Sequence, residues 1–272
     1  MSMFTAGDLD YCRQLVHQVA GLLLDERKDY LFETRLRVVV DDYGFGGTAQ
    51  LVEALKRPAS GELRARVVDA MTTNETSFFR DEHPFEALRE FVLPSLLEAG
   101  GRRSMDIWSA ASSTGQEAYS LAMLLRENVP EPYVSRARIR ATDLSLRVLA
   151  QARAGIYSDV EVQRGLSPSL RERYFERDGR CWRVQPPLRR MVEFGEFNLT
   201  GSWANVGQMD VVFLRNVLIY FDVATKQRIL GELRRVLRPD GLLCLGAAET
   251  VLGIRDDFVP VRLGRATFYR PA

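Results

Sequence analysis

The sequence contains few cysteines and histidines, and these shortages exclude two classes of protein. Its 272 residues include three cysteines, Cys12, Cys181 and Cys244, and two histidines. The cysteines are far apart and show no C-x-x-C spacing, so neither a disulfide framework nor a zinc site is predicted. We therefore expect no bound metal and a reduced, cytoplasmic setting.

Excess charge and long apolar runs are also missing. The 37 basic residues nearly balance the 36 acidic ones, which gives no bulk attraction to nucleic acid. The first residues, MSMFTAGDLDYCRQLV, carry acids where a signal peptide needs basic side chains. No apolar run approaches the ~20 residues of a membrane span. We expect a cytoplasmic, monomeric protein that neither binds nucleic acid nor inserts into a membrane.

Residues 1–72 are predicted to form a small all-helical domain. Apolar residues recur at three- and four-residue steps from Asp8 to Leu24. The same period continues to Tyr43, and Gly44 follows where a helix end favours a left-handed residue. Two further helices are separated by the breaker RPASG.

Residues 73–272 are predicted to form a doubly wound, Rossmann-like α/β domain. The apolar runs MDIWSA, ARIRATD and MDVVFLRN are each followed by a helical segment, and GLLCLG adds a fourth strand. Buried strands that alternate with helices indicate a parallel sheet covered on both faces.

Two segments depart from this alternation. Between about 156 and 194, the turn residues Asp178 and Gly179 predict a hairpin, and hence a small inserted antiparallel subdomain. At the C-terminus, DDFVPVRLGRATFYRP has two alternating runs about a glycine and no helix, which predicts an antiparallel strand pair.

Ligands of open α/β sheets bind beyond the carboxyl ends of the strands, so the turns there are the candidate site. The first turn, SAASSTGQEAYS, lacks G-x-G-x-x-G, and no pyrophosphate cradle is predicted. Glu117 in this turn suits a cationic ligand group, or else only a favourable charge at the helix start. In ATDLS, Asp143 suits the hydroxyls of a ribose, or else an N-cap of the next helix.

The third turn and a nearby loop carry further candidates. FLRNVLIYFD places Arg215, Asn216 and Tyr220 at the same edge of the sheet, although Asn216 also suits a cap and Tyr220 a core aromatic. EFNLTG places Asn198 and Leu199 where an amide could bind a base and a leucine could pack on its face. The turns together predict a nucleoside pocket without phosphates, with a carboxylate for a positive group. S-adenosylmethionine has that chemistry.

The stretch TTNETSFFRDEHPF lies between helical segments and suits a linker, a cap or part of a site. Asp81 is predicted to cap a helix from Glu82 to Leu97. Phe78 and Phe79 are expected to anchor the segment in apolar packing.

Five motifs together carry a family resemblance. NETSFFRD, IWSAASSTGQEAYSLAMLL, ATDLSLRVLAQARAGIY, FLRNVLIYFD and GLLCLGAAET resemble, in order, the motifs of the chemotaxis receptor methyltransferases, the CheR family. The resemblance covers nearly the whole chain. It implies an S-adenosylmethionine-dependent protein-glutamate O-methyltransferase that esterifies glutamates on the cytoplasmic helical bundle of methyl-accepting chemoreceptors and releases S-adenosylhomocysteine.

The resemblance also implies roles for individual residues. Arg80 and Tyr220 would lie near the transferring methyl group as catalytic residues. The cofactor would be bound by Asn74, Thr76, Arg80, Glu117, Asp143, Asn198, Leu199, Arg215 and Asn216, with Asp143 on the ribose. Family members commonly show Cys and GEEPYS where this chain has Ser112 and GQEAYS, which leaves Glu117 in place.

A second departure concerns partners. Family members that bind a receptor's C-terminal pentapeptide resemble one another in a longer, glycine-rich hairpin, whereas ERDGRCW is short. We therefore expect this chain not to depend on the pentapeptide. Arg27, Lys28, Arg35 and Arg37 could contact acidic receptor helices, or else lie on a solvated helix face.

The expected reaction needs no general base. A glutamate substrate has a pKa of ~4.3 and is already anionic near neutral pH. This agrees with a chain whose histidines, His17 and His83, have no serine or cysteine placed beside them. Methylation of another acceptor is a weaker alternative, because NVLIY lacks both prolines of the N-P-P-Y string of many amino-group methyltransferases. A non-catalytic cofactor-binding signalling module is another alternative, and the intact Arg80 and Tyr220 disfavour it.

Overall fold

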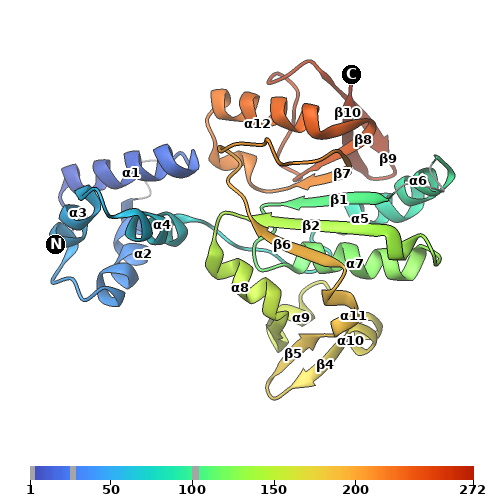
Figure 1. Ribbon diagram of the computed structural model, residues 1–272, viewed down its shortest axis with the longest axis horizontal. Helices are drawn as coiled ribbons and strands as arrows, with labels where there is room; N and C mark the ends of the chain where they lie inside the picture. The colour runs from blue at the N-terminus through green and yellow to red at the C-terminus, as the bar shows by residue number, and fades with distance from the viewer. Residues whose placement is uncertain (1–3, 25–28, 100–103) are drawn as a thin grey trace.

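The computed structural model describes residues 4–24, 29–99 and 104–272, with a helical N-terminal region beside a larger α/β body (Figure 1). The helical region contains α1 (Ala6–Ala20), α2 (Asp29–Asp42), α3 (Thr48–Lys56) and α4 (Gly61–Met71). Their apolar faces pack into one core that includes Val16, Phe32, Leu51 and Val67. The predicted helical character of this region is confirmed. None of the helices in the described ranges is long and apolar enough to cross a membrane.

The α/β body is built on a seven-stranded sheet in the order β6-β2-β1-β7-β8-β10-β9. Its strands are β1 (Met105–Ala110), β2 (Ala137–Asp143), β6 (Val192–Glu196), β7 (Met209–Leu214), β8 (Leu237–Leu245), β9 (Phe258–Leu263) and β10 (Ala266–Pro271). β6, β2, β1, β7 and β8 run parallel, whereas β10 lies antiparallel between β8 and β9. Both the doubly wound sheet and the antiparallel C-terminal pair are therefore confirmed.

The side chains of the central strands alternate between two cores, one on each face of the sheet. Ile107 and Phe213 belong to the core under α5 (His83–Ala87) and α7 (Gln116–Asn128). Trp108 and Val212 belong to the core under α12 (Val223–Val236), which Figure 1 shows on the opposite side of the sheet. Because both faces are buried, these strands read as continuous apolar runs in the sequence.

A small second sheet is inserted between α8 (Leu146–Ala154) and β6, at the bottom of Figure 1. It contains β3 (Ile156–Ser158), β4 (Phe175–Asp178) and β5 (Cys181–Val184), all antiparallel, with α9 (Asp159–Gln163), α10 (Pro168–Tyr174) and α11 (Pro186–Arg189) around it. The Asp178–Gly179 turn joins β4 to β5 as predicted. β6 begins at Val192 and pairs with β2 in the large sheet, so the small sheet's segment ends before the expected residue 194.

The helix predicted from Glu82 to Leu97 is divided into α5, a π-helical turn (Leu88–Val92) and α6 (Leu93–Ala99). The prediction that Asp81 caps it is wrong. Glu82 precedes the helix and no side chain caps it, and Asp81 has φ +65°, outside the extended conformation of an N-cap. The Asp81 carboxylate instead accepts a hydrogen bond from the Arg215 guanidinium at 2.6 Å. This oxygen therefore bonds a buried guanidinium in place of a helix N–H.

Candidate functional site

A cavity lies at the carboxyl ends of β1, β2 and β7, against the helical region. All of the predicted site residues line it, namely Asn74, Thr76, Arg80, Glu117, Asp143, Asn198, Leu199, Arg215, Asn216 and Tyr220. The structure therefore brings together side chains from segments far apart in the sequence. Their individual roles remain predictions.

The turn after β1 forms one wall and presents Glu117 from the first turn of α7. Ser113 has φ +52° and Gly115 φ +93°, which bends the chain sharply between strand and helix. The buried Glu117 carboxylate accepts a hydrogen bond from Ser109 Oγ at 2.7 Å and another from Arg215 Nη1 at 3.1 Å. A carboxylate can accept about four hydrogen bonds, so Glu117 keeps sites for a cationic group of a ligand.

Asp143 ends β2 and is held from two sides. Its Oδ2 accepts from the Ser113 backbone N–H at 2.8 Å, and its Oδ1 accepts from the Ser145 N–H at 2.9 Å. The cap of α8 is Ser145 rather than Asp143, because Ser145 Oγ accepts from the Val148 N–H. Burial raises the pKa of the Asp143 carboxyl above its usual value near 3.8, and these backbone bonds offset only part of the lost hydration.

Arg215 follows β7 and joins two parts of the cavity wall. Besides its bond to Glu117, its Nη2 donates to the Arg80 carbonyl at 3.0 Å and to Asp81. The Arg215 side chain is only 2% exposed. Burial lowers the pKa of its guanidinium, but the carboxylates of Glu117 and Asp81 raise this pKa, and the net change is a rise. The guanidinium thus holds Glu117 and the linker of residues 72–82 in fixed positions relative to each other.

Asn216 is held in the left-handed conformation by Glu249, for which no role was predicted. Asn216 has φ +59°, and its backbone N–H donates to Glu249 Oε2 at 2.7 Å. Glu249 also accepts from the N–H groups of Val217 at 2.8 Å and Gly246 at 2.7 Å. An acidic residue just after a strand was the available sequence signal for this role.

The linker of residues 72–82 crosses the cavity and presents Asn74, Thr76 and Arg80 to it. Phe78 is fully buried and packs edge-on against Tyr157 and Phe175 of the insert, which confirms that it anchors the segment. The Arg80 guanidinium donates to the Glu75 carbonyl at 2.9 Å. This contact is exposed, and both residues line the cavity.

Asn198 connects the sheet to the helical region. Its Nδ2 donates to the Val19 carbonyl at 2.7 Å, and its Oδ1 accepts from the N–H and hydroxyl of Thr200 at 2.9 and 2.8 Å. One N–H of this amide remains for a base, and Leu199 beside it is 9% exposed. The Asn198 Oδ1 already accepts from Thr200.

The helical region supplies a wall that the sequence patterns did not indicate. Leu22, Leu24, Leu31 and Arg35 line the cavity together with the predicted residues. Leu22 pairs with Phe221 as an isolated antiparallel bridge, and the Leu23 N–H donates to the Tyr220 carbonyl at 2.8 Å. Helical periodicity identified these leucines only as apolar residues. It gave no information about which surface they would face.

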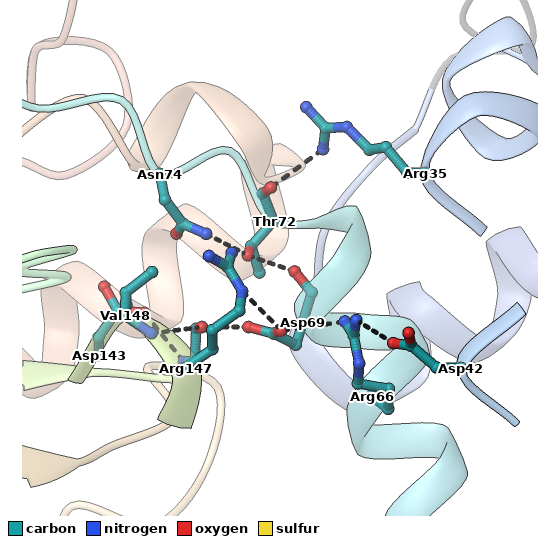
Figure 2. Close-up of polar contacts among 10 residues, drawn as sticks. Arg35, Asp42, Arg66, Asp69, Thr72, Asn74, Asp143, Arg147 and Val148 are labelled. Carbon is teal, nitrogen blue, oxygen red and sulfur yellow. Dashed lines mark hydrogen bonds and ion pairs between the residues drawn. The ribbon is translucent and has the colours of Figure 1, made fainter. Parts of the chain in front are cut away.

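The predicted receptor-contact residues are not all available on a solvated surface. Arg27 and Lys28 lie outside the described residues. The Arg35 Nη1 donates to the Met71 carbonyl at 2.8 Å and to the Thr72 carbonyl at 3.0 Å, and Figure 2 shows the second of these bonds. This guanidinium therefore fixes the start of the linker. Arg37 is exposed, although it also has a partner within the chain.

Comparison with known proteins supports a methyltransferase site. Residues 74–266 match the family model for the CheR methyltransferase, SAM binding domain. The chain is 41% identical to chemotaxis protein methyltransferase 1 of Pseudomonas aeruginosa, over 97% of both chains. It is 39% identical to chemotaxis protein methyltransferase Cher2 of Pseudomonas putida over 98% of this chain and 99% of that one. The Escherichia coli chemotaxis protein methyltransferase is 38% identical over 87% of this chain and 82% of its own.

Proposed function

This chain belongs to the CheR family of S-adenosylmethionine-dependent methyltransferases, and we propose that it methylates glutamate side chains on the cytoplasmic helical bundle of chemoreceptors. The observation that carries the proposal is the convergence of Arg80, Tyr220 and Asp143 on one cavity. The names of the relatives support a chemotaxis role.

The residues of the cavity fit the cofactor. Asp143 keeps acceptor sites for ribose hydroxyls, and Glu117 keeps sites for an ammonium group. Ser112 Oγ is buried at the cavity wall without a hydrogen-bond partner among the described residues, as expected of a group that awaits a ligand. Leu199 supplies apolar surface for a base.

The chain's own contribution to the reaction would be positioning. S-adenosylmethionine, when bound, supplies an electrophilic methyl group on a sulfonium. A glutamate carboxylate is anionic near neutral pH, so no residue has to remove a proton from it. We propose that Arg80 orients carboxylates of cofactor and substrate and that the Tyr220 hydroxyl helps to aim the attack. Correct alignment can supply about 7 to 11 kcal/mol of the barrier.

The acceptor can be identified by the lability of the product. The chain is incubated with methyl-labelled cofactor and receptor fragments and then treated with base. A carboxyl ester releases volatile labelled methanol, which is the expected result. Base-stable label would show another acceptor, and absence of label would show a binding module. Either of these results would refute the proposal.

The short hairpin supports a second part of the proposal, that receptor recognition does not require a C-terminal pentapeptide. The turn between β4 and β5 contains only Gly179 and Arg180. A Cβ added at Gly179 would have no heavy atom within 4 Å, so this turn is not packed against the rest of the described chain. Calorimetric titration with such a peptide should give no measurable heat. Binding at micromolar concentration would contradict this part.

We further propose that residues 1–72 form a domain separate from the methyltransferase domain of residues 73–272. The helices of the N-terminal region pack into their own hydrophobic core, from Phe4 to Met71, which supports this division.

A further inference from the structure

Asp69 is a polar residue of α4 to which the reaction described above gives no role. Its side chain is 12% exposed, and it lies where α4 approaches the start of α8. The carboxylate accepts hydrogen bonds from the Ser145 hydroxyl and from Arg147 Nε, the latter at 3.3 Å. Arg66 Nη1 lies 3.4 Å away, and Arg66 also pairs with Asp42 at 2.8 Å (Figure 2). Arg66 and Arg147 balance the negative charge of the mostly buried Asp69 carboxylate.

One branch of contacts leads from Asp69 to Asp143, the residue predicted to bind the ribose. The Ser145 hydroxyl donates to Asp69 and accepts from the Val148 N–H at 3.3 Å. Both contacts fix the position of Ser145, whose backbone N–H donates to Asp143 Oδ1 at 2.9 Å. The orientation of the Asp143 carboxylate therefore depends on a residue of the helical region.

A second branch leads from Asp69 to the linker. The Asp69 carbonyl accepts from the Thr72 hydroxyl at 2.7 Å, and this hydroxyl accepts from Asn74 Nδ2 at 2.9 Å (Figure 2). The Asn74 carbonyl then accepts from Ser113 Oγ at 2.7 Å, while the Ser113 N–H donates to Asp143 Oδ2 at 2.8 Å. The two branches meet at Asp143, where Ser145 and Ser113 donate to opposite oxygens, and so close a hydrogen-bonded ring that reaches the cavity wall.

We propose that Asp69 is a positioning residue for cofactor binding, which orients Asp143 toward the ribose through the Ser145 hydroxyl. The inference rests on the proposed function, because it takes Asp143 as the ribose ligand. If so, the contact between α4 of the helical region and the start of α8 contributes to the cofactor site. A side chain that only joined two domains would have no effect specific to the ribose.

The test compares Asp69→Ala with Asp69→Asn, which keeps an acceptor oxygen for Ser145. Asp42→Ala is the matched control, because it removes the same charge from the same arginine network but lies outside the ring. Each full-length variant is titrated calorimetrically with S-adenosylhomocysteine and with its 2′,3′-dideoxy analogue. Thermal unfolding checks that each variant is folded.

We expect Asp69→Ala to weaken binding of S-adenosylhomocysteine roughly three- to tenfold, the worth of one hydrogen bond. Binding of the dideoxy analogue should be unchanged, and Asp69→Asn and Asp42→Ala should resemble the wild type for both ligands. Equal weakening of both ligands, or wild-type affinity in Asp69→Ala, would overturn the inference. If Asp69→Ala does not fold, Ser145→Ala takes its place with the same expectations. A wild-type chain that binds neither ligand would refute the cofactor site itself, which is a separate result.

Discussion

Substitution of Gly165 by alanine should damage the site from a distance. Gly165 lies in the insert, with φ +88°, and an added Cβ would lie 1.9 Å from the Phe78 carbonyl oxygen. A Cβ atom essentially never lies within 3.0 Å of another heavy atom, so one backbone segment must move by roughly 1 Å. Phe78 cannot move alone, because its ring is packed against Tyr157 and Phe175 at centroid distances of 5.1 and 5.5 Å. The displacement should pass along the linker to Arg80.

Gly179 provides the matched control for this substitution. It lies in the turn between β4 and β5 of the same insert and has φ +60°, but nothing lies within 4 Å of its added Cβ. Gly179→Ala should therefore cost only the left-handed strain, about 1–2 kcal/mol of unfolding free energy. Gly165→Ala should cost a further 1–3 kcal/mol or so through the overlap with Phe78. Urea unfolding of the two variants measures the difference.

The activity assay tests the same reasoning at the site. A misplacement of about 1 Å can cost ~10²-fold in rate, so Gly165→Ala should lower methyl transfer to receptor fragments by about ten- to a hundredfold. Gly179→Ala should keep a nearly wild-type rate. If Gly165→Ala is as stable and as active as Gly179→Ala, the proposed link from the insert through Phe78 to Arg80 is refuted.

Three further substitutions, and a fourth as a control, test individual residues. Arg80→Ala should reduce methyl transfer by orders of magnitude in a labelled-methyl assay, and a nearly wild-type rate would exclude its proposed role. Burial raises the pKa of the Asp143 carboxyl above 3.8, so the carboxylate is protonated at a higher pH than an exposed aspartate. The affinity for S-adenosylhomocysteine should therefore fall as the pH is lowered through this raised pKa. Asp143→Asn should flatten that part of the calorimetric pH profile, and an unchanged profile would contradict the assignment. Arg215→Met leaves the buried Glu117 without its cation and should cost about 3–5 kcal/mol in urea unfolding. Arg173→Met breaks an exposed pair with Glu127 and should cost far less than Arg215→Met, because water screens that pair; equal costs would contradict the assigned burial effect.

The sequence by itself determined the order of the elements and the edge of the sheet where the site lies. MDIWSA and ARIRATD form β1 and β2 within the predicted bounds, because runs of buried apolar residues are a local signal of a parallel strand. The turns after parallel strands must meet at one edge. This is why Glu117, Asp143 and Arg215 could be placed together before their contacts were known.

Only the tertiary structure decided how those residues are held. The local sequence predicted that Asp81 is a helix cap, but Arg215, far along the chain, donates a hydrogen bond to the Asp81 carboxylate. Asn198 binds the Val19 carbonyl of the helical region, and Asp69 reaches Ser145 across the joint. Each of these bonds joins residues whose separation in the sequence carries no period or motif. Local patterns report which faces are apolar and where helices end, whereas the pairing of distant polar groups depends on how the packed elements meet.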